Sequence, residues 1–209
     1  TASGKSALAT ELAIRYGGEI VSCDSMQVYR GLDIGTAKST KAEMRGIPHH
    51  MTDATDPRED FSCADYVEMA EKAVKDILSR GKLPIFCGGT GLYLDSFLRG
   101  TRDDGAIRDE AVRTELAEYA EENGAEALHE KLREVDPDAA DAIHPNNVKR
   151  VIRALEVFRV SGKTKTELDR LSREKDCEYD PLIICLKAEN RELLYGRIDR
   201  RAEEMMKKG

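Results

Sequence analysis

The chain has 209 residues, of which 40% are hydrophobic and 35% are charged, and its formal net charge is −7 at pH 7. This length suffices for one large domain or for a core with a smaller appendage. No apolar run approaches the roughly 20 residues that span a membrane, so we expect no membrane association. The acidic balance argues weakly against a nucleic-acid partner, although clustered basic residues count for more than the total charge.

The first hundred residues alternate between helix and strand patterns. Residues 6–16 and 63–80 carry apolar residues at helical spacing, and the short apolar runs 19–23 and 82–87 predict strands. Ser62 and the acidic first turn that follows it are typical of a helix start. Alternation of this kind predicts a parallel sheet with helices on its faces.

After residue 100 the pattern changes. Residues 101–180 show only helical periods with charged faces, 181–187 (PLIICLK) predicts a buried strand, and 191–208 predicts a charged helix. We therefore expect an α/β core over 1–100, an all-helical insertion over 101–180, and a return strand and helix over 181–209. A phosphate-binding loop needs a strand before it and the last helix stops abruptly, so we expect a sequence cut at both ends.

The five cysteines indicate a reducing compartment. Their number is odd, they form no C-x-x-C pair, and Cys23 and Cys87 lie in apolar strand-like runs. This usage is typical of reduced thiols rather than of a disulfide framework or a zinc site, so we expect a cytoplasmic protein. Because residue 1 already lies inside a motif, we expect no signal peptide.

The chain opens with the second half of the phosphate-binding motif G-x-x-x-x-G-K-[ST], directly followed by a predicted helix: Thr1, Ala2, Ser3, Gly4, Lys5 and Ser6. Gly4 lets backbone amides face a phosphate oxygen, Lys5 supplies positive charge, and the Ser6 hydroxyl can bind Mg²⁺ at the positive end of the helix dipole. The motif predicts a polyphosphate site without identifying the polyphosphate. The alternative is a chance Gly-Lys-Ser before a solvated helix.

Asp24 directly follows the predicted strand 19–23. Ligands bind at the carboxyl ends of strands in α/β sheets, so we expect Asp24 to face the same crevice as the phosphate loop. A carboxylate there can bind Mg²⁺ through water or act as a general base, and alternatively it caps the next turn. Residues 31–38 form a glycine-hinged loop with a lysine, interpreted as a mobile substrate-contact segment. The glycine-rich segment 88–91 follows another strand, and it is either a site of close backbone approach or a plain tight turn.

The predicted helix 147–160 has one apolar and one basic face. Lys149, Arg150 and Arg153 fall together on a helical wheel. A local basic stripe in an acidic protein suits a phosphate backbone, although an ordinary solvated face would look the same.

Five motifs together resemble the tRNA dimethylallyltransferase family. They are TASGKS at the start, DSMQVYRGLDIGTAK at 24–38, HHMTD at 49–53, GGTGLY at 88–93, and HPNN, KR and IRALEV within 144–157. They follow the family's order across nearly the whole chain. The resemblance implies a P-loop NTPase-like α/β fold with a helical tRNA-binding insertion. It also implies transfer of the dimethylallyl group from dimethylallyl diphosphate to N6 of the adenosine at tRNA position 37, next to the anticodon, with release of diphosphate.

The same resemblance implies residue roles. Asp24 corresponds to the general base that takes a proton from the adenine amine, and Lys5, Ser6 and Arg201 share the catalytic role. The positions implied for the diphosphate, with Mg²⁺ as cofactor on Ser6, are Thr1, Ala2, Ser3, Gly4, Lys5, Ser6 and Arg201. The positions implied for the tRNA anticodon stem-loop are Asp24, Ser25, Met26, Gln27, Thr90, Arg113, Lys149, Arg150, Val151, Ile152 and Arg153.

Three other functions stay open. An adenylate isopentenyltransferase would run the same chemistry on a free nucleotide, and a small-molecule kinase would use the P-loop for ATP. A regulatory nucleotide-binding module would perform no chemistry. The kinase would need lid arginines and a pocket for a hydroxyl substrate, whereas a basic stripe on a helical insertion is better explained by tRNA. We expect a monomer.

Overall fold

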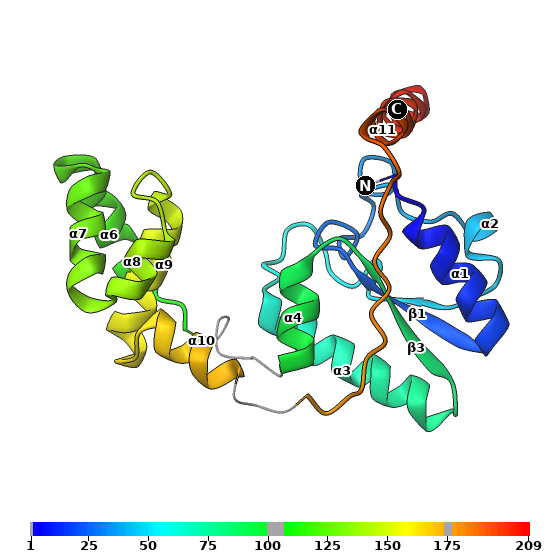
Figure 1. Ribbon diagram of the computed structural model, residues 1–209, viewed down its shortest axis with the longest axis horizontal. Helices are drawn as coiled ribbons and strands as arrows, with labels where there is room; N and C mark the ends of the chain where they lie inside the picture. The colour runs from blue at the N-terminus through cyan, green and yellow to red at the C-terminus, as the bar shows by residue number, and fades with distance from the viewer. Residues whose placement is uncertain (1, 100–106, 174–176) are drawn as a thin grey trace. The chain divides into compact units, whose positions relative to one another are not determined.

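The computed structural model describes residues 2–99, 107–173 and 177–209. They belong to two compact units (Figure 1), a core unit of Thr1–Leu98 with Tyr179–Gly209 and a helical unit of Arg99–Glu178. None of the helices in the described ranges has the length and apolar character needed to cross a membrane.

A parallel sheet of order β2-β1-β3 organises the core unit. β1 (Gly18–Cys23) is central, and all six of its residues are buried, as expected for a strand covered on both faces. β3 (Leu83–Gly88) pairs with β1 along its whole length, and the short β2 (His49–His50) pairs with β1 on the other side. The parallel sheet is confirmed, and β2 is a strand within the region that the sequence indicates as loop.

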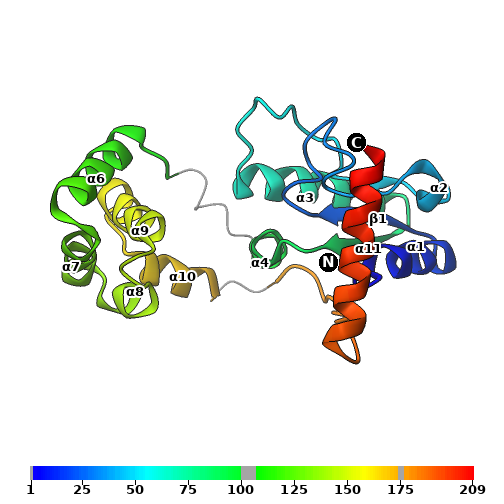
Figure 2. The same ribbon diagram turned by 90° about the horizontal axis from the view of Figure 1, so that it is seen from above.

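Helices cover both faces of this sheet, as Figures 1 and 2 show. α1 (Lys5–Tyr16) packs on one face, and α3 (Cys63–Ser79) and α4 (Gly91–Arg99) pack on the other. Because successive strand residues point to opposite faces, Ile20 joins the apolar cluster beside α1 whereas Val21 joins the cluster beside α3. The alternation of strand and helix in the sequence therefore identifies the layers of the core unit correctly.

The predicted return strand over 181–187 is wrong. This segment forms no strand, and Leu182 and Ile183 are 88% and 64% exposed. An apolar run becomes a strand only where a neighbour accepts its ladder hydrogen bonds and a second layer covers its side chains. In the described part of the chain neither condition is met here. The helix that follows, α11 (Arg191–Lys208), is confirmed, and a short helix, α2 (Lys41–Met44), lies in the predicted loop region.

The helical unit packs short helices around an aliphatic core. Leu116, Leu128, Leu132 and Val151 are at most 1% exposed in that core. Trp is absent from the chain, so branched aliphatic side chains supply the buried apolar area. The all-helical character of the insertion is confirmed by α6 (Glu110–Asn123), α7 (Ala125–Val135), α8 (Pro137–Ala142), α9 (Val148–Ser161) and α10 (Lys165–Arg173).

Glu19 is a buried charge near the start of β1, only 1% exposed. Its carboxylate accepts hydrogen bonds from both terminal nitrogens of Arg80, from Lys82 Nζ at 2.7 Å, and pairs with His50 Nε2 at 2.7 Å. The hydrogen bonds from Arg80 lower the pKa of Glu19, burial raises it, and Lys82 and His50 lower it further, so that it lies far below its usual range. The group ties β1 to β2, to the end of α3 and to the start of β3.

Replacing Glu19 with Gln is therefore expected to lower the free energy of unfolding at pH 7 by about 3 kcal/mol, because Arg80 and Lys82 lose their buried countercharge. A depressed carboxyl pKa contributes stability that is present above the ordinary value of about 4.3 and is lost as pH falls. The difference between the two proteins should thus shrink below about pH 4. Urea unfolding at several pH values measures this difference in the free energy of unfolding. Glu11→Gln, which breaks an exposed pair with Arg45, is the control and should change stability by less than about 1 kcal/mol.

Candidate active site

A crevice of about 690 Å³ lies in the core unit at the carboxyl ends of the strands. Asp24 lines it together with Arg201 of α11 and with the phosphate loop, of which Ala2, Ser3, Gly4, Lys5 and Ser6 are described. Thr1 lies outside the described residues. The structure thus brings together groups from the first helix, the end of β1 and the last helix, separated by up to the whole length of the chain.

The phosphate loop presents an uncapped helix start. Gly4 is the N-cap of α1 in the left-handed conformation, with φ 86°, and no side chain accepts a hydrogen bond from the first-turn amides. Glycine adopts this conformation without the Cβ penalty that other residues meet. Lys5 Nζ donates to Ser3 Oγ at 3.2 Å, which leaves further N–H groups for a ligand. Free amides, a helix dipole and an ammonium group together suit a phosphate.

Arg201 adds a second cation to the crevice. Its Nε is buried and has no hydrogen-bond partner among the described residues. Buried donors are nearly always satisfied in folded proteins, and a guanidinium group with a free donor in the same crevice as a phosphate loop suits an anionic ligand. Glu204, Met205 and Lys208, on the same face of α11, also line the crevice.

Asp24 caps a turn and also faces the crevice. Its Oδ1 accepts hydrogen bonds from Met26 N at 2.9 Å and Gln27 N at 3.4 Å. For Oδ2 no hydrogen bond is found in the described ranges, so this oxygen is available to a substrate. The turn-capping and proton-accepting interpretations of Asp24 therefore use different oxygens and are compatible.

The segments after β1 and β3 are joined directly. Thr90 Oγ1 accepts a hydrogen bond from Ser25 N at 2.9 Å, and the amides of Gly89 and Thr90 both donate to the Cys23 carbonyl at 3.0 Å. Gly88 stands opposite Cys23, where a Cβ would overlap the Cys23 carbonyl group. The segment 88–91 is thus a site of close backbone approach.

Gln27 is engaged inside the protein. Its Nε2 donates to Thr36 O at 3.1 Å and Ala37 O at 3.3 Å, and its Oε1 accepts from Ser22 Oγ at 3.2 Å. The amide therefore fixes the loop 31–38 instead of projecting into solvent. Met26, which is 50% exposed, is the member of the 24–27 segment presented to solvent.

Two cysteines near the crevice are neutral thiols. Burial raises the pKa of Cys87 more than a hydrogen bond with Ser6 and the charge of Lys5 lower it, and burial raises the pKa of Cys23 to about 11. Cys87, which lines the crevice, therefore adds no negative charge beside the phosphate loop. All five cysteines are free, as their pattern predicts.

Comparison with known proteins identifies the family. The sequence model of the family described as IPP transferase matches residues 27–209. The chain belongs to this family. It is 50% identical over 208 residues to a tRNA dimethylallyltransferase of Caldanaerobacter subterraneus subsp. tengcongensis, covering 99% of this chain and 66% of that protein. It is 47% identical over 209 residues to the same enzyme of Halalkalibacterium halodurans, covering 100% of this chain and 66% of that protein.

Solved structures of family members support the same family assignment. The full-length tRNA isopentenylpyrophosphate transferase from Bacillus halodurans is 45% identical with a TM-score of 0.65, and the match covers 100% of this chain and 64% of that one. A eukaryotic dimethylallyltransferase described as acting on tRNA is 32% identical with a TM-score of 0.81, covering 99% of this chain and 51% of that one. The chain thus spans slightly less than two thirds of the curated relatives, and it shares their fold.

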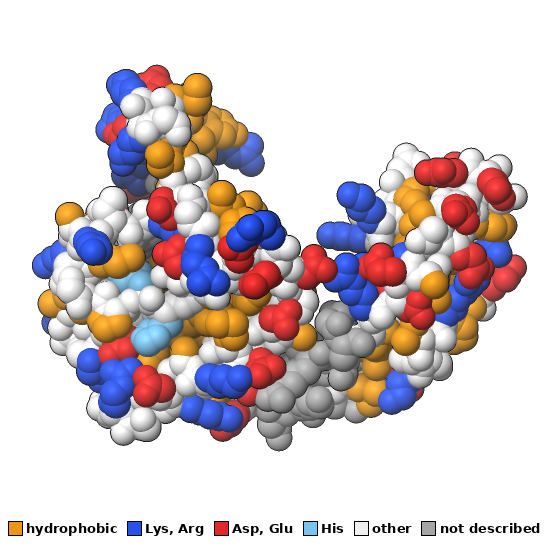
Figure 3. Space-filling view, turned by 180° about the vertical axis from the view of Figure 1, so that it is seen from behind, with side chains coloured by type: hydrophobic (Ala, Val, Ile, Leu, Met, Phe, Trp, Pro, Cys, Tyr) orange, Lys and Arg blue, Asp and Glu red, His pale blue; other side chains and the backbone are white. Residues whose placement is uncertain are grey.

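In this IPP transferase family member, the basic stripe of α9 divides into an exposed pair, Lys149 and Arg150, and Arg153, which binds a buried acid. Lys149 and Arg150 are exposed, and no ion pair is found for either within the described ranges. Val151 is 0% exposed and belongs to the helical-unit core, against which Ile152 packs, so the Val151 side chain is not available to a ligand. Figure 3 shows Lys and Arg side chains gathered along one edge of this unit.

Arg113 and Arg153 bind a buried acid that sequence reasoning missed. Glu156 is 0% exposed, and its carboxylate accepts hydrogen bonds from Arg113 Nε at 2.8 Å, Arg153 Nη1 at 2.6 Å and Asp109 N at 2.9 Å. Burial raises the pKa of Glu156, but the hydrogen bonds from Asp109, Arg153 and Arg113 together bring it below the ordinary value. The signal in the sequence was the spacing of Arg153 and Glu156, which lie three residues apart and so face each other on one helix.

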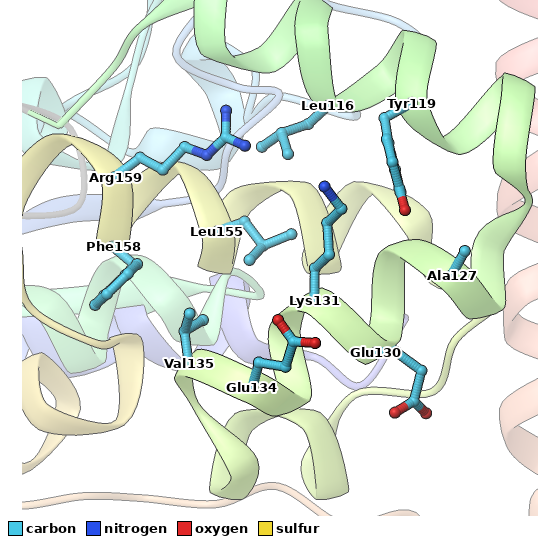
Figure 4. Close-up of a pocket in the computed structure, with 10 residues that line it drawn as sticks. All are labelled: Leu116, Tyr119, Ala127, Glu130, Lys131, Glu134, Val135, Leu155, Phe158 and Arg159. Carbon is cyan, nitrogen blue, oxygen red and sulfur yellow. The ribbon is translucent and has the colours of Figure 1, made fainter.

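A second hollow, of about 490 Å³, lies within the helical unit between α6, α7 and α9 (Figure 4). Leu116, Leu155 and Phe158 give it apolar walls. Lys131 reaches across it, with Nζ 3.8 Å from the Tyr119 ring centroid. None of the residues predicted for the diphosphate or the tRNA lines this hollow.

Proposed function

We propose that this chain carries the active centre of a tRNA dimethylallyltransferase, which moves a dimethylallyl group from dimethylallyl diphosphate to N6 of the adenosine at tRNA position 37. The observation that carries the proposal is the shared crevice, in which Asp24 faces the phosphate loop and Arg201. The family's acceptor and donor would meet there, with the base on one side and the diphosphate on the other.

The chemistry divides between these groups. The allylic C–O bond of the donor breaks readily because the developing carbocation is delocalised, so the main task is to neutralise the departing diphosphate. Lys5, the α1 amides and Arg201 supply fixed positive potential for that purpose. As the C–N bond forms, the adenine amine loses its proton to Asp24, and the crevice holds the two substrates in line.

The oxygen donors of the crevice fit a hard divalent cation. The Ser6 hydroxyl and the Asp24 carboxylate both line it, and oxygen is the ligand type that Mg²⁺ prefers. We propose that Ser6 holds Mg²⁺, which when bound neutralises part of the diphosphate charge.

The proposed acceptor is the anticodon stem-loop of tRNA. An adenine stacked in a duplex is out of reach, whereas a loop base can be turned outward into a pocket. The exposed Lys149 and Arg150 suit the phosphate backbone of such a stem-loop. The five free cysteines support a reducing, cytoplasmic setting, and a monomer stays a prediction.

The direct test is incubation of the protein with labelled dimethylallyl diphosphate, Mg²⁺ and unmodified tRNA, followed by mapping of the label. Label on N6 of the adenosine next to the anticodon is the expected result. Label on free AMP in a parallel reaction without tRNA would favour an adenylate isopentenyltransferase. Formation of ADP from ATP and a small-molecule acceptor, without label transfer, would favour a kinase.

Reversing two charges with Lys149→Glu and Arg150→Glu should weaken tRNA binding mainly at low salt. Loss of two phosphate contacts is expected to reduce the slope of log Kd against log salt concentration by about 1 to 2. Binding titrations at several salt concentrations measure the slope. The control pair Lys72→Glu and Lys75→Glu on α3 changes the net charge equally and should leave the slope almost unaltered. Equal slopes for both pairs would place the RNA elsewhere.

A further inference from the structure

We infer that Lys38 is a positioning residue, which holds the loop 31–38 as a wall of the crevice and does not itself bind the diphosphate. Lys38 lines the crevice, as do Asp33, Ile34 and Ala37 of the same loop. A lysine in that place would ordinarily be assigned to the phosphate, but its contacts point to another role. The kinetic part of the inference rests on the proposed function, whereas the structural part does not.

The Lys38 ammonium group is saturated by protein acceptors. Its side chain is 6% exposed, and Nζ lies 2.5 Å from Tyr29 O, 2.9 Å from Asp33 Oδ1 and 2.6 Å from Asp53 Oδ1. An ammonium group has three N–H donors, and these three acceptors use all of them. Lys5 differs, because its one described acceptor is Ser3 Oγ.

The positive charge of Lys38 is also compensated by neighbouring carboxylates. Burial lowers its pKa, but the hydrogen bonds to Asp53 and Asp33 raise it above the ordinary value, so the group stays an ammonium. One positive charge faces two carboxylates, and the local sum is negative. An added diphosphate would gain little attraction from this group, whereas Lys5 and Arg201 face the crevice with donors to spare.

Two of the three acceptors of Lys38, Tyr29 and Asp53, lie outside the loop in paired segments of the core unit. Tyr29 forms a parallel bridge with Thr55, Arg30 N donates to Thr55 O at 2.9 Å, and Asp53 N donates to Gln27 O at 3.2 Å. Lys38 therefore connects the far end of the loop to the paired segments that continue from β1 and β2. Gln27 supplies the second tether, through its bonds to the Thr36 and Ala37 carbonyls.

The loop needs such tethers because one of its residues, Ala37, has an unfavourable backbone conformation. Ala37 has φ 49°, in the left-handed region that non-glycine residues rarely adopt. Residues in this region persist where their surroundings hold them. Gln27 also donates its backbone N–H to Asp24 Oδ1, so the loop and the proposed base share one support.

The test compares Lys38→Met with wild-type protein. Met keeps the length of the side chain and removes all three donors. Hydrogen exchange of the amides in residues 31–40 should become at least about tenfold faster. The Kd for inorganic pyrophosphate, measured by calorimetry, should stay within about twofold of the wild-type value. In kinetic assays, kcat/KM for tRNA should fall by tenfold or more, while KM for dimethylallyl diphosphate changes little. Glu19→Gln is the matched control, because it breaks another buried ion group of the core unit whose members do not line the crevice. It should alter neither the hydrogen exchange of the amides in residues 31–40 nor the ratio of KM for tRNA to KM for dimethylallyl diphosphate.

Unchanged exchange of residues 31–40 in Lys38→Met would overturn the inference. A tenfold loss of pyrophosphate affinity would also overturn it, because Lys38 would then be a phosphate ligand. If Lys38→Met does not fold, Asp53→Asn, which weakens one bond and removes one countercharge, takes its place with the same readouts. Faster exchange in a protein whose wild-type form transfers no prenyl group to tRNA would refute the proposed function and leave the role of Lys38 in the loop standing.

Discussion

Replacing Asp24 with Asn is expected to lower kcat for the proposed dimethylallyl transfer by about 10²-fold or more, because an amide cannot accept the proton that would leave the adenine amine. Asn keeps an oxygen that can accept from the Met26 and Gln27 amides, so the turn after β1 should be preserved. Affinity for inorganic pyrophosphate should change by less than about threefold, since the phosphate loop and Arg201 are untouched. Single-turnover kinetics with saturating substrates measure the effect on chemistry.

Asp24→Ala separates the two roles of the carboxylate. This variant loses both the turn cap and the proposed base, so it should be as inactive as Asp24→Asn and also less stable, by about 1 kcal/mol for the lost hydrogen bonds. Near-normal turnover of Asp24→Asn combined with a damaged Asp24→Ala would show that the residue only caps the turn.

Gly88→Ala is expected to destabilise the core unit by about 3 kcal/mol or more. A Cβ at this position would overlap the Cys23 carbonyl and lie 2.7 Å from Cys23 Cα. These are backbone atoms of the paired strand, so the clash can be relieved only by moving β1 from β3. The same carbonyl accepts from the Gly89 and Thr90 amides, and activity should fall together with stability.

Urea unfolding and pyrophosphate binding measure both consequences of Gly88→Ala. Gly89→Ala is the matched control for stability, because no atom lies within 4 Å of a Cβ built there. If Gly88→Ala unfolded at the same urea concentration as the wild type, the close approach of β1 and β3 at their carboxyl ends would be contradicted.

Periodicity and cap residues predicted the layers of the core unit well. The apolar spacing of α1 and α3 and the apolar runs at β1 and β3 reflect local rules, whereas the sheet order β2-β1-β3 depends on pairing between segments distant in the sequence. The strand predicted at 181–187 failed for a different reason. Its composition is that of a buried strand, but a strand exists only through its pairing partner, and composition alone does not supply one.

The candidate site could be predicted in outline but not in detail. Strand-end logic correctly placed Asp24 beside the phosphate loop. Sequence spacing could not show that the Lys38 ammonium group binds Asp33 and Asp53, because those partners are set by the path of an irregular loop. Glu156 was missed because its burial depends on Arg113, which comes from another helix, α6.

The buried carboxylate of Glu156 has an evolutionary consequence. Positions 113, 153 and 156 form one electrostatic unit of two cations and one anion, so replacing any one of them alone is expected to lower stability. A neutral residue at 156 would leave two guanidinium groups repelling each other, and a neutral residue at either arginine would weaken the compensation of the anion. Divergence in this part of the family is therefore expected to proceed by coupled replacement of all three side chains.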